Sequence, residues 1–122
     1  MRGALLLAAV FLGLPAAAAQ AAPPPRATAY VFFSSMCTGC RAEMPAVYAW
    51  LGRHPQLREI GVGYRETAAQ GRKFAAEVGF GAPVIGDPAA ELGRRYAVHE
   101  LVQIVVVRDG RVLMRYQPPA KS

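Results

Sequence analysis

The sequence predicts one α/β domain in which a mixed β-sheet carries helices on both faces. Three observations support this prediction. Short apolar runs alternate with stretches of helical periodicity, and connections of that length join parallel strands. Asp109-Gly110 stands between two apolar runs, which is a strong signal for a hairpin and therefore for an antiparallel edge. No internal repeat is visible, and the roughly 100 residues that follow the N-terminal apolar stretch correspond to a single domain.

The first strand and the first helix meet at a pair of cysteines. The run Tyr30–Phe33 is aromatic and β-branched, as is typical of a buried strand. Cys37 and Cys40 follow this run, and Gly52–Pro55 ends the segment with helix-stop residues. Between these points the apolar side chains recur at the spacing of one helix face: Met44, Val47, Tyr48 and Leu51. Both cysteines should therefore lie at, or just inside, the N-terminus of a helix.

The next elements continue the alternation. Leu57–Tyr64 predicts a second strand, although its glycines leave the boundaries open. Thr67–Val78 predicts a second helix, which Gly79 closes. Pro83–Ile85 predicts a very short strand or extended segment.

The C-terminal part predicts a third helix and a hairpin. Asp87 and Pro88 have the residue types of an N-cap and a first-turn proline, for a helix that runs to Tyr96. Val102–Val107 is too continuously apolar for a half-exposed strand, and Arg111–Tyr116 is the predicted return strand.

The position of the cysteines has a chemical consequence. Free N–H groups and the helix dipole place partial positive charge at a helix N-terminus, which favours thiolate over thiol. The pKa of a cysteine in this setting falls from about 8.5 into a range of roughly 3.5 to 7.5. The spacing also permits a disulfide, and so short a loop gains little from closure entropy, so the bridge is better suited to chemistry than to stability. We predict that Cys37 is the attacking nucleophile and Cys40 the resolving thiol.

The segment around the cysteines resembles a known active site. A strand, small polar residues and C-x-x-C precede Arg41, Glu43, Met44 and Pro45, which is similar to the active-site segment of thioredoxin-like proteins. The pattern most resembles the motif W-C-x-P-C-R-x-E-M-P of the secreted TlpA/ResA-like branch. Pro45 stands where the active-site helix of that family is kinked. The resemblance extends over residues 29–116.

The resemblance implies a fold and an activity. The implied fold is a thioredoxin-like three-layer α/β/α sandwich with a mixed sheet, here lacking the usual C-terminal helix. An uncovered sheet face leaves apolar area exposed, which suggests a partner or self-association. The implied activity is exchange of electrons with protein thiols and disulfides, for example during cytochrome c maturation, with a membrane electron donor upstream and no cofactor.

Two further departures from the family pattern concern the surroundings of the cysteines. The family carries a cis-proline in the loop that faces them, and Val102 occupies this position, so we predict a trans Leu101–Val102 bond in a substrate-facing loop of altered shape. Val31 occupies the position at which thioredoxin has a buried acid. Water, or His99 and Glu100 on the opposing loop, are the predicted proton acceptors for Cys40.

The N-terminus has the pattern of a signal peptide over residues 1–21. Arg2 precedes an apolar run and an alanine-rich zone, where cleavage could follow Ala19 or Ala21. An uncleaved membrane anchor is disfavoured, because the run is shorter than the ~20 residues of a membrane span. Residues 22–28 form a Pro-rich linker, residues 29–117 the domain and residues 118–122 a loose tail. The predicted location is the periplasm or the extracellular space.

Several functions are compatible with the sequence. The first is an exported thiol–disulfide oxidoreductase that acts on client proteins through Cys37 and Cys40. A Cu(I)-binding metallochaperone would use the same cysteines with Met36 or His99, because sulfur and imidazole suit soft metals. A peroxidase and a redox-inert interaction domain are further alternatives, although the proline that opens the peroxiredoxin motif is missing. The arginines are scattered rather than clustered with aromatics, so nucleic-acid binding is not expected, and no resident metal is assigned.

Overall fold

The computed structural model describes residues 26–119, which form one five-stranded sheet and three helices. The strands are β1 (Thr28–Phe33), β2 (Arg58–Tyr64), β3 (Val84–Asp87), β4 (Gln103–Arg108) and β5 (Arg111–Tyr116). The helices are α2 (Cys40–Gly52), α3 (Ala68–Val78) and α4 (Glu91–Arg95). The predicted signal peptide, residues 22–25 of the linker and residues 120–122 of the tail lie outside the described residues. Within the predicted tail, Pro118 is buried and Pro119 is exposed.

The sheet is mixed, as predicted, with β1 at its centre. Its strand order is β3-β2-β1-β4-β5. β1 pairs in parallel with β2, which pairs in parallel with β3. β4 runs antiparallel to β1 and to β5. The C-terminal ends of β1 and β2 and the N-terminal end of β4 therefore lie side by side, at the same end of the central strands.

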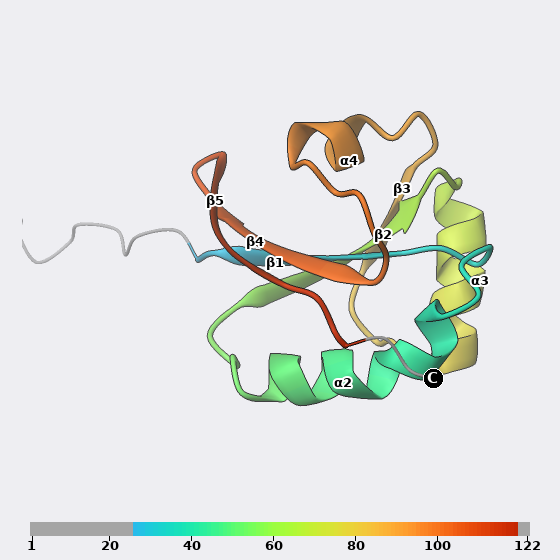
Figure 1. The fold of residues 1–122 in the computed structure, drawn as a ribbon, viewed down its shortest axis with the longest axis horizontal. Coiled ribbons are helices and arrows are strands. Elements are labelled where there is room, and N and C mark those ends of the chain that lie inside the picture. Colours follow the sequence, from blue (N-terminus) through green and yellow to red (C-terminus); the bar gives the residue numbers. More distant parts are fainter. Residues whose placement is uncertain (1–25, 120–122) are drawn as a thin grey trace, which may run out of the picture.

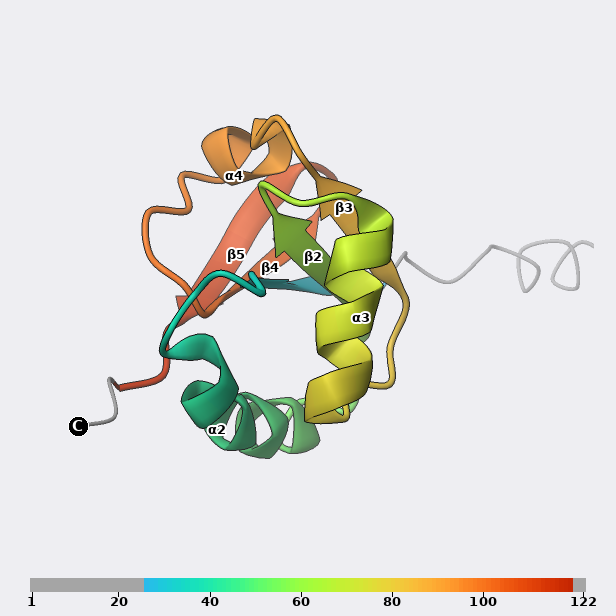
Figure 2. The same cartoon turned by 90° about the vertical axis from the view of Figure 1, so that its right-hand side faces the viewer.

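The helices form two layers, one on each face of the sheet. Ala29, Val31 and Phe33 of β1 belong to the apolar cluster that also holds residues of α2 and α3. Phe32 points to the opposite face, where it packs in a second cluster with Tyr96 at the end of α4. Figures 1 and 2 show α4 on the opposite side of the sheet from α2. The predicted three-layer α/β/α arrangement is confirmed.

Local chemistry explains where most elements begin and end. Thr67 caps α3 with a capping box completed by Gln70, and Gly79 ends that helix in the left-handed conformation, with φ of 79°. Asp109 and Gly110 have φ of 52° and 76°, so both central residues of the β4–β5 turn have the positive φ that a type I′ hairpin requires. The predicted hairpin is therefore confirmed.

The third helix is shorter than predicted. The sequence pattern placed its start at Asp87, but Asp87 ends β3, and α4 begins only at Glu91. The carboxylate of Asp87 reaches forward and accepts hydrogen bonds from the N–H groups of Leu92 (3.1 Å) and Gly93 (2.9 Å). The residue does cap the helix, but from the end of a strand. The capping role of Asp87 was predicted correctly, whereas the turn between Asp87 and Glu91 could not be predicted from residue types.

No helix follows β5 within residues 26–119, and aromatic side chains join the end of β5 to α2. The ring of Tyr116 stacks on Trp50 of α2, with ring centroids 5.5 Å apart. His54 stacks on Trp50 at 3.8 Å. The apolar side chains of β5 remain open to solvent: Val112, Leu113 and Met114. None of the helices in residues 26–119 is long and apolar enough to cross a membrane.

Candidate redox site

Cys37 and Cys40 form a disulfide at the start of α2. Cys40 is the first residue of the helix and Gly39 its N-cap, whereas Cys37 lies in the preceding turn. The Cα atoms of the two cysteines are 5.4 Å apart, and the Cys40 N–H donates to the Cys37 carbonyl at 3.3 Å. Cys40 is completely buried, whereas Cys37 is partly exposed. This asymmetry is the one expected for a pair in which one sulfur meets a partner and the other stays covered.

The turn that carries Cys37 is built from small polar residues after β1. Ser34 accepts a hydrogen bond from the Met36 N–H on its hydroxyl (3.0 Å) and one from the Cys37 N–H on its carbonyl (3.2 Å). These bonds reverse the chain sharply at the end of β1. The side chain of Met36 is turned out to solvent by this reversal, with 85% of its surface exposed.

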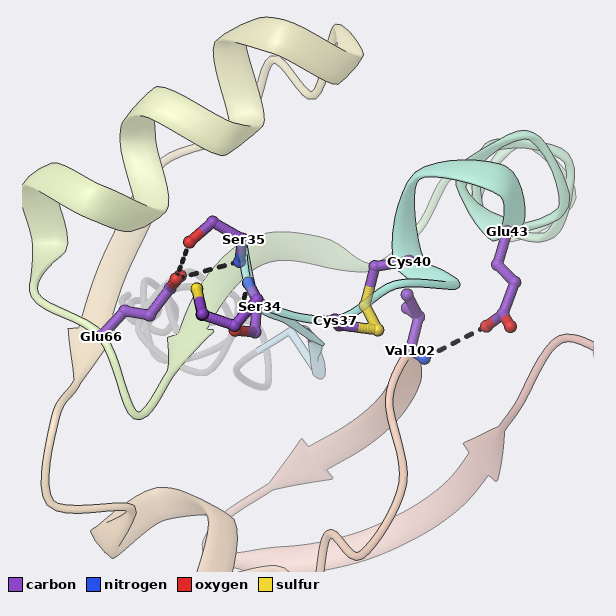
Figure 3. Close-up of a disulfide and its surroundings, with 8 residues drawn as sticks. Ser34, Ser35, Cys37, Cys40, Glu43, Glu66 and Val102 are labelled. Atoms are coloured by element: carbon purple, nitrogen blue, oxygen red, sulfur yellow. Dashed lines mark hydrogen bonds between the residues drawn. A yellow bond between two sulfur atoms is a disulfide. The ribbon is translucent and has the colours of Figure 1, made fainter.

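A buried carboxylate, Glu66, ties this turn to the segment after β2. Glu66 accepts hydrogen bonds from the N–H of Ser35, at 2.9 Å, and from the Ser35 hydroxyl. Only 4% of its surface is exposed, and its Oε1 atom has no hydrogen-bond partner among residues 26–119. Figure 3 shows Glu66 and Ser35 on one side of the disulfide. Glu66 could not be predicted as a site residue, because nothing local in the sequence distinguishes it from a solvated loop acid.

On the other side of the disulfide lies the loop that precedes β4. Leu101 is half-buried, and Val102 is completely buried in the same apolar cluster as Cys40. The Leu101–Val102 peptide bond is cis, so the predicted trans bond is wrong. The prediction considered only the intrinsic preference of a non-proline peptide. In the folded chain the Val102 side chain is enclosed and its N–H is bonded to a buried acid, and these contacts set the loop conformation.

That acid is Glu43, in the first turn of α2. Its Oε1 accepts a hydrogen bond from the Val102 N–H at 3.2 Å, and only 8% of Glu43 is exposed (Figure 3). Its second oxygen lies against the backbone of Gly39, 3.1 Å from where a β-carbon would stand. In the sequence Glu43 stands out only as part of the C-x-x-C motif segment. Its i+3 spacing from Cys40 places both residues on one helix face, and that spacing was the available signal.

The two other predicted site residues lie farther out. His99 and Glu100 are both exposed, and Glu100 accepts a hydrogen bond from the Gln117 side chain at 2.5 Å. Neither residue lines the hollow beside Cys37, which is formed by Ser34, Met36, Tyr64, Arg65 and Leu101. Their role as proton acceptors stays a prediction. Among residues 26–119 no group of three or more His, Cys, Asp or Glu side chains is placed to hold a metal ion.

Comparisons with known proteins identify the fold. No protein-family model and no curated protein sequence matches the chain. Among solved structures, the chain is similar to StoA from Bacillus subtilis, with 19% identity and a TM-score of 0.60 over 80% of this chain and 77% of that one. A secreted Mycobacterium tuberculosis disulfide oxidoreductase homologous to Escherichia coli DsbE has 21% identity and a TM-score of 0.60, over 80% of this chain and 74% of that one. The thioredoxin domain of a thiol–disulfide oxidoreductase from Bacteroides vulgatus has 14% identity and a TM-score of 0.60, over 77% of this chain and 71% of that one.

These similarities, together with the sheet order and the position of the cysteines, define the fold class. The chain has a thioredoxin-like fold, as the sequence predicted, with a C-x-x-C disulfide at the start of the first helix after the central strand.

Proposed function

We propose that this protein is a thiol–disulfide oxidoreductase that exchanges electrons with the cysteines of client proteins. The observation that best supports this function is the Cys37–Cys40 disulfide at the start of α2, with one sulfur partly accessible and the other enclosed. A protein client can approach only the accessible sulfur, so exchange begins at Cys37. The activity given for the structurally similar proteins from M. tuberculosis and B. vulgatus supports the same function.

The exchange proceeds in two balanced steps. A client thiolate attacks the sulfur of Cys37, a client–Cys37 disulfide forms, and Cys40 leaves as a thiolate. The second client thiolate then attacks the client sulfur of this mixed disulfide and releases Cys37 as a thiolate. The client has lost two electrons, and the pair Cys37 and Cys40 has gained them. The reverse sequence reduces a client disulfide, and a dithiol donor then returns the cysteines to the reduced form.

The start of α2 favours the thiolates that this exchange requires. The unpaired N–H groups of the first turn and the helix dipole stabilise negative charge there, which favours the thiolate form of the reduced cysteines. Cys40 must lose its proton before it attacks a mixed disulfide. Glu43 is the buried carboxylate in the same helical turn, and water, His99 and Glu100 are the candidates on the solvent side.

The proposed setting is outside the cytoplasm. The signal-peptide pattern of residues 1–21 supports export, and one of the structurally similar proteins is a secreted oxidoreductase. The TlpA-like resemblance of the motif adds a membrane electron donor as the upstream partner. The exposed apolar side chains of β5, an edge strand of the sheet, support self-association or contact with a partner.

The function is tested with the protein lacking residues 1–21 and two matched cysteine variants. The wild-type protein should cycle between dithiol and disulfide and catalyse reduction of insulin by a dithiol donor. Cys37→Ser should abolish this activity. Cys40→Ser should instead accumulate a mixed disulfide with a client, visible as a thiol-sensitive band shift on a non-reducing gel. Equal activity of the wild type and Cys37→Ser would overturn the proposal.

The same preparation tests the copper alternative. Cys37 and Met36 line one hollow and together offer two sulfur ligands to Cu(I). A reduced protein that binds Cu(I) stoichiometrically but shows no disulfide exchange would replace the oxidoreductase by a metal-binding function.

A further inference from the structure

A hollow of about 280 Å³ adjoins Cys37 where the segments after β1, after β2 and before β4 meet. Ser34 and Met36 come from the turn after β1, Tyr64 and Arg65 from the end of β2, and Leu101 from the loop before β4. Of the two cysteines only Cys37 lines it. Any polypeptide that brings a sulfur to Cys37 therefore lies along or beside this hollow.

One part of the hollow is apolar and exposed to solvent. Met36 is the most exposed of the large apolar side chains in residues 26–119, with 85% of its surface in solvent. Leu101 and the ring of Tyr64 lie on the same hollow. An unbranched methionine adapts to different apolar surfaces, so these side chains suit a bulky apolar residue of a bound segment.

The other part of the hollow carries a fixed positive charge. The backbone of Arg65 has a φ of 59°, and its N–H donates to the Asp87 carbonyl at 2.9 Å. Its guanidinium lies over the ring of Tyr64, 5.3 Å from the centroid. The bound backbone and the stacked head group hold the charge at the rim of the hollow.

No carboxylate of the described residues pairs with this guanidinium. The ion pairs in residues 26–119 join Arg41 and Lys73 to Glu77, on another part of the surface. Two acids that adjoin Arg65 through the backbone have their carboxylates bound to other groups: Glu66, the next residue, and Asp87, whose carbonyl accepts from the Arg65 N–H. Glu66 accepts hydrogen bonds from Ser35, and the carboxylate of Asp87 accepts those of the α4 backbone. The charge of Arg65 is therefore available to a ligand.

We propose that Arg65 selects clients in which a carboxylate and a bulky apolar side chain lie close to the reacting cysteine. This inference rests on the oxidoreductase function proposed above and names the class of substrate. The carboxylate pairs with the guanidinium of Arg65 while the apolar side chain covers Met36. An Arg–carboxylate pair is geometrically specific, and charge complementarity mainly sets the rate of productive encounter.

The test compares two synthetic dithiol peptides that differ at one position only. This position lies two residues from the reacting cysteine and holds Glu in one peptide and Lys in the other. Exchange with the oxidised protein at low ionic strength is stopped by acid at set times, and the oxidised peptide is quantified by chromatography. A neighbouring charge also changes the reactivity of the peptide thiol itself. The Glu/Lys rate ratio of each Arg65 variant is therefore divided by the same ratio for the control variant Arg72→Glu. Arg72 is exposed on α3 and lies outside the hollow. The double comparison isolates the contribution of Arg65.

We expect a Glu/Lys rate ratio that falls by about threefold to tenfold in Arg65→Glu relative to Arg72→Glu, and by less in Arg65→Gln. Added salt should bring the ratios together. An unchanged ratio in a folded Arg65→Glu and in Arg65→Gln would overturn the selection by Arg65. If the wild type still reduces insulin, the oxidoreductase function stands in that case. A wild type that exchanges with neither peptide nor insulin would overturn both.

Discussion

The carboxylate of Glu43 and the backbone N–H of Val102 are joined by a hydrogen bond of 3.2 Å across 59 residues of chain. Both residues are buried, with exposed fractions of 8% and 0%. This bond connects the first turn of α2, which begins with Cys40, to the loop that lies opposite the disulfide. The geometry around the cysteines therefore depends on a contact between two segments that are far apart in sequence.

Replacing Glu43 by Ala should lower the free energy of unfolding by about 1–3 kcal/mol, because a buried N–H loses its acceptor. Glu43→Gln should cost less, since an amide oxygen can accept the same bond. Urea denaturation of the oxidised forms measures both values. Equal losses in the two variants would show that the charge of Glu43 at the helix start matters, rather than its bond to Val102.

The regular elements could be predicted because their patterns are local. The spacing of Met44, Val47 and Leu51 and the Asp109-Gly110 turn depend on residues within a few positions, and the structure confirms them. The environment of the cysteines could not be predicted in the same way. The conformation of the loop at Val102 and the burial of Glu66 depend on segments that meet only after folding. A local preference was the only basis for the trans prediction, and tertiary contacts override such preferences.

A close backbone approach at Gly86 gives a prediction with a matched control. A β-carbon on Gly86 would stand 2.4 Å from the Ala68 N atom, against the backbone that begins α3. Gly86→Ala should therefore destabilise the protein by about 1–3 kcal/mol or more. Gly52, at the end of α2, has nothing within 4 Å of its β-carbon position, and Gly52→Ala should stabilise by roughly 0.5–1 kcal/mol. Thermal unfolding of both variants decides; a loss at Gly52 equal to that at Gly86 would contradict the packing argument.

Because of the Tyr48 hydroxyl, the free energy of unfolding should depend on pH in the alkaline range. This hydroxyl donates to the Val78 carbonyl at 2.5 Å, and burial raises its pKa above the ordinary value of 10.0. The folded state therefore retains this proton more tightly than the unfolded state. The stabilising contribution is complete below pH 10 and is lost as the pH rises through the folded pKa.

Tyr48→Phe removes both the hydrogen bond and this titration. At pH 7 the variant should be less stable than the wild type by about 0.5–1.5 kcal/mol. The difference should shrink above pH 10, because only the wild type loses stability through Tyr48. Urea denaturation of the pair from pH 7 to pH 11 measures it. A difference that stays constant over this range would contradict the raised pKa.

The stack of Tyr116 on Trp50 joins the end of β5 to α2 and should contribute to stability. Tyr116→Ala should lower the free energy of unfolding by about 0.5–1.5 kcal/mol beyond the loss of buried area, because an aromatic pair is removed. Trp50 is the only tryptophan in the chain, so its emission should also shift to longer wavelength as water reaches the ring. Leu113→Ser, an exposed change on the same strand, is the control and should alter stability by no more than about 0.5 kcal/mol. An unchanged Trp50 emission in Tyr116→Ala would mean that the two rings are not stacked in solution.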